Sequence, residues 1–130
     1  MQDDRQAILD LFPKWHTATK NRDIKTLTSL MTDDVVFLTP GQPPMRGPQA
    51  FADAFQAIPA DLQFEIGEFQ VQELQVEGHW AYCWCSVAVS LISPQKGPVR
   101  TRKGYTLSVL RQKADRTWAI ARDANLLADI

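Results

Sequence analysis

The spacing of apolar residues in the first half of the chain predicts helices. Between positions 3 and 20 they recur at intervals of three and four, which places them on one face of a helix. Pro13 lies inside that pattern, so we expect either a kink there or a helix that begins later. Two shorter helices are predicted over 24–31 and 48–58, with a short strand over 35–38 between them.

From residue 62 the period of the pattern changes to two, which is typical of strands. The parity of the alternation switches near Gly67, which indicates a β-bulge in a bent strand. Further strands are predicted over 80–93, 99–111 and 117–127, with short turns between them. The order of elements predicts an α+β fold, in which three N-terminal helices pack on a strongly bent antiparallel sheet.

The predicted strands present two faces of different character. Over 80–93, one face alternates cysteine with aliphatic residues, whereas the other mixes Trp and Tyr with Ser and Ala. Because the helices can cover only one face, we expect the mixed face to line a cavity and the aliphatic face to be exposed. An exposed apolar face of this size predicts an interface. We therefore expect a homodimer, packed sheet to sheet through Cys83, Cys85, Val87, Val89, Tyr105 and Leu107.

Length, charge and composition narrow the class of protein. A chain of 130 residues fits a single domain over 1–130. Its 14 basic and 15 acidic residues lack the basic excess of a protein that binds nucleic acid. The sequence shows neither a signal peptide nor the roughly 20 apolar residues of a membrane helix, so we expect a cytoplasmic protein with no membrane partner. No phosphate-loop or dinucleotide motif occurs, and we expect no cofactor.

Several short motifs follow one another along nearly the whole chain. They are Arg22-Asp23-x-x-x-Leu27-x-x-Leu30, Asp33-Asp34-Val35-Val36-Phe37-x-x-Pro40, Arg46-Gly47, Ala81-Tyr82, Gly104-Tyr105-Thr106, Trp118-Ala119-Ile120 and Asp123-Ala124-Asn125. In this order they resemble the SnoaL-like families of the nuclear transport factor 2-like superfamily, which also includes ketosteroid isomerase. The resemblance implies a cone-shaped, cystatin-like fold with a deep internal pocket, commonly in a dimer.

The resemblance also says where the isomerases of that superfamily carry their chemistry. They place a Tyr in the first helix, an Asp before the Pro that follows the first strand, and an acid on a late strand. The matching positions here are Trp15, Thr39 and the neighbourhood of Gly104. None of these can act as an acid or base, so the resemblance implies the fold without the ketosteroid proton relay.

Asp123 is the catalytic candidate. It shares strand parity with Asn125 on the expected pocket face, where burial would raise its pKa and suit it to proton transfer near neutral pH. The alternative is a structural carboxylate that pairs with Arg102 or with backbone groups. Arg102 could hold a ligand carboxylate or phosphate through its planar fork, or could lie at a solvated strand end.

The expected ligand-binding residues combine aromatic side chains with a few polar ones. They are Trp15, Phe37, Thr39, Met45, Phe51, Phe55, Trp84, Arg102 and Asn125. The aromatic members could equally be core, and Asn125 and Thr39 could serve turns or caps. No metal site is expected, because His16 and His79 are far apart in the sequence and lack a third ligand.

The sequence therefore predicts a small-molecule-binding protein with an apolar pocket. If it is an enzyme, we expect a cofactor-independent isomerase, cyclase or hydrolase acting on a small hydrophobic or carboxylate-bearing metabolite. The alternative is a non-catalytic dimerisation or association module. An open, polar-lined pocket containing Asp123 favours the first function, whereas a pocket filled by Trp15, Trp84 and Phe55 favours the second.

Overall fold

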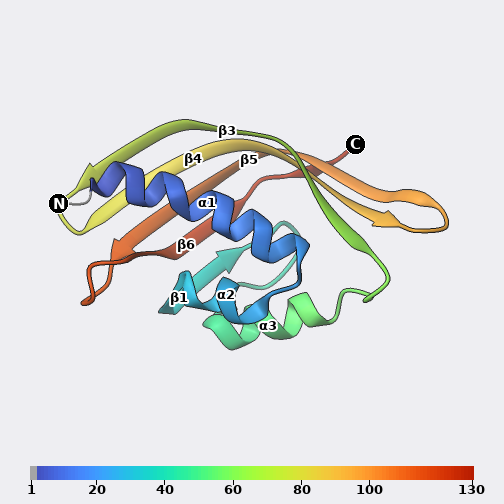
Figure 1. Ribbon diagram of the computed structural model, residues 1–130, viewed down its shortest axis with the longest axis horizontal. Helices are drawn as coiled ribbons and strands as arrows, with labels where there is room; N and C mark the ends of the chain where they lie inside the picture. Colours follow the sequence, from blue (N-terminus) through green and yellow to red (C-terminus); the bar gives the residue numbers. More distant parts are fainter. Residues whose placement is uncertain (1–2) are drawn as a thin grey trace.

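Three helices lie against one curved sheet in the computed structural model, which describes residues 3–130 (Figure 1). They are α1 (Asp4–Lys20), α2 (Ile24–Ser29) and α3 (Pro48–Gln56). The Asp3 carboxylate caps α1 by accepting a hydrogen bond from the Arg5 N–H at 3.0 Å. Because α1 runs from Asp4 through Pro13, the alternative of a helix that begins late is wrong.

Within residues 3–130, seven strands form the sheet. They are β1 (Met31–Leu38), β2 (Met45–Arg46), β3 (Gln63–Glu77), β4 (Trp80–Ser93), β5 (Gly97–Gln112), β6 (Trp118–Asn125) and β7 (Ala128–Asp129). Their order is β2-β1-β6-β5-β4-β3, and β7 pairs with β5. The α+β prediction is confirmed, but the sheet is mixed, because β1 runs parallel to β6. No hairpin joins these two strands, so adjacency in the sequence does not fix their direction.

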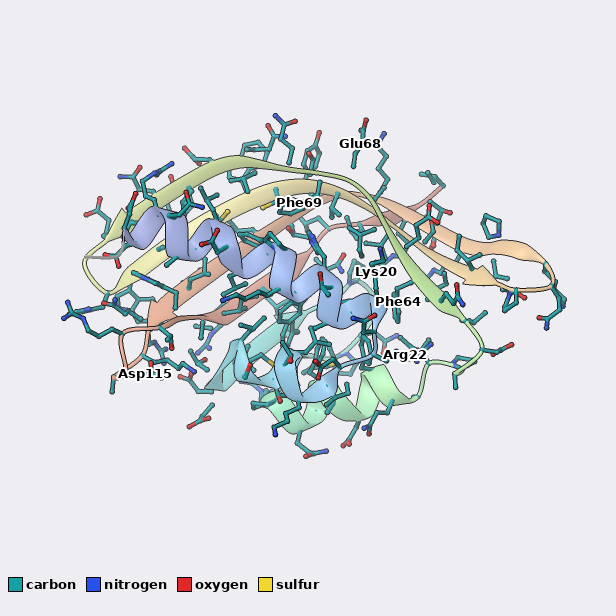
Figure 2. All side chains as sticks on the ribbon, viewed as in Figure 1. Lys20, Arg22, Phe64, Glu68, Phe69 and Asp115 are labelled. Atoms are coloured by element: carbon teal, nitrogen blue, oxygen red, sulfur yellow. The ribbon has the colours of Figure 1, made fainter. Side chains whose placement is uncertain are left out.

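A bulged β3 makes the sheet bend. Its pairing with β4 shifts register between Ile66 and Phe69, which confirms the bulge predicted near Gly67. A Cβ at Gly67 would lie 3.3 Å from the Cβ of Ala88, so the close approach favours glycine. Beyond the bulge the ordinary alternation resumes, and Glu68 and Phe69 point to opposite sides of the sheet (Figure 2). The long strands thus arch over α1 (Figure 1).

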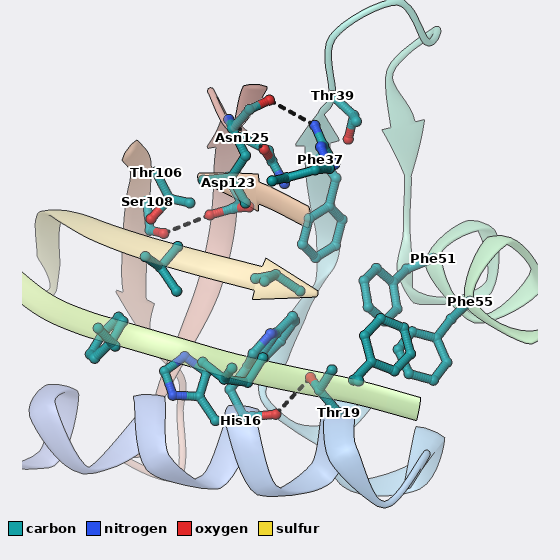
Figure 3. A pocket seen from close by; sticks show the side chains of 18 of the residues that line it. His16, Thr19, Phe37, Thr39, Phe51, Phe55, Thr106, Ser108, Asp123 and Asn125 are labelled. Atoms are coloured by element: carbon teal, nitrogen blue, oxygen red, sulfur yellow. Dashed lines mark hydrogen bonds between the residues drawn. The ribbon is translucent and has the colours of Figure 1, made fainter. Parts of the chain in front are cut away.

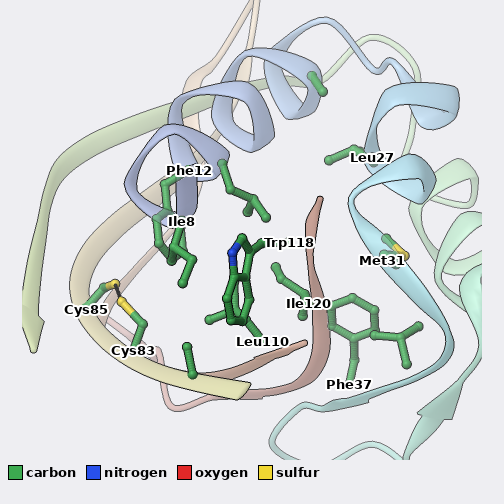
Figure 4. Packing of buried hydrophobic residues seen from close by; sticks show 14 of the residues in the cluster. Ile8, Phe12, Leu27, Met31, Phe37, Cys83, Cys85, Leu110, Trp118 and Ile120 are labelled. Carbon is green, nitrogen blue, oxygen red and sulfur yellow. Dashed lines mark hydrogen bonds between the residues drawn. The ribbon is translucent and has the colours of Figure 1, made fainter. Parts of the chain in front are cut away.

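The main core lies between α1 and the concave side of the sheet (Figure 4). Its buried members come from all three helices and from β1, β3, β4, β5 and β6: Ile8, Leu11, Phe12, Ala18, Leu27, Met31, Val35, Phe37, Phe55, Leu74, Ala81, Cys83, Cys85, Leu110, Trp118 and Ile120. The Trp118 indole N–H donates to the Asp4 carboxylate at 3.1 Å, which ties the start of α1 to β6. No helix over residues 3–130 has the length and apolarity needed to cross a membrane.

The faces of β4 are the reverse of those predicted. Cys83 and Cys85 are buried in the core, and Val87 and Val89 line a cavity on the same concave side. Small side chains occur where α1 packs directly on the strand, because larger ones would not fit beneath the helix. Four of the six residues expected at a dimer interface therefore face inward. Tyr105 and Leu107 do lie on the convex side, where they are 54% and 42% exposed.

Candidate functional site

A cavity of about 340 Å³ lies between α1, α3 and the concave face of the sheet (Figure 3). This volume is near the lower end of the range of roughly 300–1,000 Å³ found for ligand sites. Seven aromatic residues line it: Phe12, Trp15, Phe37, Phe51, Phe55, Phe64 and Phe69. Its polar residues are His16, Thr19, Thr39, Arg100, Arg102, Thr106, Ser108, Asp123 and Asn125. The cavity thus combines apolar walls with a small set of polar groups, as ligand pockets do.

One face of α1 forms the wall opposite the sheet. Phe12, Trp15, His16 and Thr19 all face the cavity, at the spacing i, i+3, i+4 and i+7 of a single helix face. The Thr19 hydroxyl donates to the Trp15 carbonyl at 2.8 Å, which satisfies this nearly buried group within the helix. The rigid helix therefore fixes the direction of the His16 and Trp15 rings.

Stacked and tilted rings form the end of the cavity near α3. The ring centroid of Phe51 lies 4.9 Å from that of Phe37 and 5.7 Å from that of Trp15. Phe55 stacks on Phe64 with 5.2 Å between the centroids. Tilted and offset ring pairs of this kind are attractive beyond the area that they bury. They present a preformed aromatic wall to a flat ligand.

Arg22 holds this wall from outside the cavity. Its guanidinium donates to three backbone carbonyls in the segment 58–62, at 2.7–3.1 Å. The same group lies over the rings of Phe55 and Phe64, at 5.9 and 5.4 Å from their centroids. Figure 2 shows Arg22 beside Phe64. Arg22 thus fastens the connection between α3 and β3 to the end of α1.

Asp123 faces the cavity from β6, directly opposite Ser108 on β5. The Ser108 hydroxyl donates to Asp123 Oδ1 at 2.7 Å (Figure 3). The side chain is partly buried, and this burial raises its pKa to about 6, although the hydrogen bond from Ser108 acts in the opposite direction. A register shift in the β5–β6 pairing, between Val109 and Leu110, allows both Ile120 and Asp123 to face the cavity.

Arg102 and Asn125 contact the segment that follows β6. Arg102 Nη2 donates to the Leu127 carbonyl at 2.9 Å, and Asn125 Oδ1 accepts from the Leu127 N–H at 2.9 Å. A Cβ at Gly104 would lie only 3.0 Å from the Leu126 carbonyl oxygen, so glycine permits this crossing. The Nε of Arg102 is buried and has no hydrogen-bond partner within residues 3–130.

Nearly all of the predicted site residues lie at the cavity. Asp123 and eight of the nine expected ligand-binding residues line the cavity. Asp123 does not pair with Arg102 in the described part of the chain, since its partner is Ser108. The Asn125 oxygen serves a turn, as its alternative interpretation held, but its amide group still faces the cavity. Whether these residues bind a ligand stays a prediction.

Trp84 is the one predicted ligand-binding residue that does not line the cavity. It lies on the convex face, where its indole N–H donates to Glu73 at 3.0 Å and its ring meets Tyr105 edge to face, with 5.9 Å between centroids. The prediction that Trp84 lines the pocket is wrong because the faces of β4 are reversed. The pocket is therefore not filled by a tryptophan from the sheet.

His16 is one of several cavity residues that were not among those predicted. Its ring packs edge-on against Phe69, 4.5 Å between centroids, and burial lowers its pKa, so the imidazole is neutral near pH 7. Reading the apolar stripe as 12, 15, 16 and 19 would have placed His16 on the same face.

The two cysteines lie in the core and not at an interface. Their sulfur atoms are 3.6 Å apart on the concave side of β4, with α1 above them (Figure 4). The neighbouring Cys83 thiol and burial raise the pKa of Cys85, which keeps that thiol protonated. Within residues 3–130, no three His, Cys, Asp or Glu side chains gather where they could hold a metal ion.

Comparison with known proteins identifies the family. Residues 13–118 match the model of the SnoaL-like domain, so the chain belongs to the SnoaL-like family. No curated protein matches the sequence. A conserved protein from Planctomyces limnophilus has a similar solved structure, with 34% identity, a TM-score of 0.90 and 98% of each chain covered.

Two more distant structures share the fold. A ketosteroid isomerase-like protein from Erwinia carotovora atroseptica has 22% identity and a TM-score of 0.80, and 100% of this chain and 98% of that one are covered. A nuclear transport factor 2-like superfamily protein from Salmonella enterica serovar Typhimurium has 13% identity and a TM-score of 0.77, with 95% and 89% covered. These likenesses confirm the predicted fold, and the match to the SnoaL-like domain confirms the predicted family.

Proposed function

We propose that this SnoaL-like protein binds a small apolar molecule in its cavity and moves protons to and from it through Asp123. The observation that carries the proposal is a carboxyl group in a largely apolar cavity whose burial raises its pKa to about 6. A group with a pKa near the working pH can both accept and return a proton. The proposal agrees with an isomerase type of reaction.

The surroundings of Asp123 suit such a transfer. Ser108 occupies Oδ1 through its hydrogen bond, which fixes the carboxyl group in one orientation. Oδ2 makes no hydrogen bond to any other described residue and is available to a ligand. We infer that the carboxylate removes a hydrogen from the carbon beside a ligand carbonyl and returns it at another position. The aromatic wall excludes water and holds the ligand flat, while Asn125 and Thr39 hold a polar end of the ligand.

Hydrogen exchange in a simple ketone tests this proposal. The protein would be incubated in D₂O with 1-indanone, and exchange of the hydrogens beside the carbonyl would be followed by NMR. We expect exchange faster than in buffer alone, with a rate that rises through about pH 6 as the carboxylate forms. Asp123→Asn should remove the acceleration while 1-indanone still binds. Equal acceleration by the wild type and the variant would contradict the role of Asp123.

A second proposal concerns association through the convex face. We propose that this face pairs with a second copy of the chain, because its large apolar residues are exposed: Trp80, Tyr82, Tyr105 and Leu107. Acidic Glu73 and Glu77 lie along β3, whereas Arg111 and Arg122 lie across the sheet on β5 and β6. A two-fold axis along the strands would bring the acidic side of each copy against the basic side of the other.

A further inference from the structure

On the β5–β6 seam, polar groups of the cavity lie at two places. Asp123 and Ser108 form one, and Arg102 lies farther along β5, beyond Thr106. Asn125 pairs with Thr106 in the sheet and lies between them. A ligand in this cavity therefore meets one group that exchanges protons and, at a separate point, one fixed positive charge.

Within residues 3–130 Arg102 makes no salt bridge. Asp129, its partner in the β5–β7 pairing, is bonded by Arg100, which chiefly lowers the pKa of that carboxyl, and the charge of Arg102 adds to this effect. Arg102 donates to the Leu127 carbonyl, and its Nε is buried without a hydrogen-bond partner in the described part of the chain. A buried N–H on a cation favours an anionic acceptor, because nothing else satisfies both its hydrogen bond and its charge.

Asn125 adds a second donor to the same place. Because its Oδ1 already accepts from the Leu127 N–H, the part of its amide group that remains for a ligand is the NH₂. Arg102 likewise offers only donors. Together they would match the oxygens of one carboxylate, whereas a phosphate would call for a second cation without a salt bridge, and Arg100 is already paired.

The apolar residues that line the cavity indicate the shape and polarity of the rest of the ligand. Rings of Trp15, Phe37, Phe51 and Phe55 line the space, and the volume of about 340 Å³ suits a compound of one or two rings. We propose that the ligand is a small aromatic or flat apolar carboxylate whose carboxylate group binds Arg102 and Asn125 and whose rings lie on the aromatic wall. This inference rests on the proposed small-molecule function, and it orients the ligand with its reactive part toward Asp123.

A pair of probes that differ only in charge tests the inference. Binding of 2-naphthoate and 2-naphthamide would be measured by calorimetry and by quenching of tryptophan fluorescence, which Trp15 makes sensitive to the cavity. We expect the wild type to bind the carboxylate at least about tenfold more tightly than the amide. Arg102→Gln should reduce that preference to less than about threefold and leave binding of the amide unchanged.

Matched variants separate this inference from the proposed function. Lys103→Gln removes a charge from the next residue of β5, which is exposed and faces away from the cavity, and should keep the full preference. Equal binding of both probes by the wild type, or an equal loss of both in Arg102→Gln, would overturn the carboxylate inference while leaving the cavity function standing. If neither probe binds and 1-indanone shows no accelerated exchange, the proposed function itself fails, and this inference fails with it.

Discussion

The concave and convex faces of the sheet differ in the size of the side chains that they carry. On β4 the concave side carries Cys83 and Cys85 under α1, whereas the convex side carries Trp80, Tyr82 and Trp84. Polarity does not explain this division, since both sets are largely apolar. The helix leaves little room above the strand, so the large rings lie outside. Where α1 and α3 diverge from the sheet, the space that remains is the cavity.

The two faces also differ in how their polar groups are satisfied. On the convex side, Arg111 pairs with Asp34 at 3.1 Å and lies over the Trp80 ring at 4.6 Å. On the concave side, Asp123 has one hydrogen bond and Arg102 has a buried N–H without a partner. Arg111 and Asp34 thus satisfy each other on the convex side, whereas Asp123 Oδ2 and Arg102 Nε have no hydrogen-bond partner within residues 3–130. This difference supports placing the chemistry inside and the association outside.

The sharpest test of the comparison uses two leucines of β5. Leu110 is 0% exposed in the core, whereas Leu107 is 42% exposed on the convex face. Leu110→Ala should lower the free energy of unfolding by about 2–5 kcal/mol, because it leaves a cavity. Leu107→Ala should lower it by less than about 1 kcal/mol. Urea unfolding at low protein concentration, where association does not contribute, measures both. Similar losses would contradict the assignment of the faces.

Asp123 should make stability depend on pH. Its pKa is raised to about 6 from 3.8 in the unfolded chain, so the folded state binds more protons between these values. Stability is therefore full below about pH 4 and falls as the pH rises through about 6, by up to about 3 kcal/mol. Asp123→Asn keeps the group neutral and should unfold at a higher temperature than the wild type at pH 8, but at a similar one at pH 4.

Thermal unfolding from pH 4 to pH 8 measures this effect. Asp61→Asn serves as the control, because Asp61 is exposed before β3 and outside the cavity. A wild type that gains stability relative to Asp123→Asn as the pH rises would show that the Asp123 carboxylate is stabilised in the folded state. That result would contradict both the burial of Asp123 and its proposed part in proton transfer.

Local patterns predicted most of the fold. The 3.6-residue period located α1 and α3, and the parity switch located the bulge at Gly67, because both depend on neighbouring residues. The parallel pairing of β1 with β6 was not predicted, since it joins strands that are distant in the sequence. Such contacts depend on how the bent sheet packs around α1, and patterns among neighbouring residues do not predict that packing.

The site was predictable where polarity marks a face, and not where both faces are apolar. On β5 and β6, Arg102 and Asp123 alternate with apolar or exposed residues, and their parity placed them correctly. On β4 the alternation of Cys with Trp carries no polarity signal, so the prediction of an aromatic pocket wall on this strand is wrong. The space between α1 and β4 determines which face of the strand carries the small side chains. That space depends on how the whole molecule packs and cannot be read from the local sequence. Trp84 was misplaced for this reason.

Arg22 offers an intermediate test on the concave side. Arg22→Gln should lower the free energy of unfolding by about 1–3 kcal/mol, because three carbonyls lose a charged donor and two rings lose a cation. Amide hydrogen exchange should become faster over residues 58–62 before the rest of the fold opens. Arg46→Gln, at an exposed position on β2, is the control. Unchanged exchange over 58–62 would show that Arg22 does not fasten this edge of the cavity.

The smallest expected effect concerns the convex face. Leu107→Glu places a charge among exposed aromatic residues and should raise the dissociation constant of a dimer by about tenfold or more, because the charge must be desolvated in the interface. Val99→Glu makes the same change at an exposed apolar residue on the β4–β5 hairpin and should leave association unchanged. Sedimentation over a range of concentrations measures both. A wild-type chain that stays monomeric would contradict pairing through this face, and the exposed rings would then need a different partner. Leu107 lies on the side of the sheet opposite the cavity, so Leu107→Glu should still bind 2-naphthamide as the wild type does. If the variant lost both dimerisation and binding of 2-naphthamide, the two faces would be coupled.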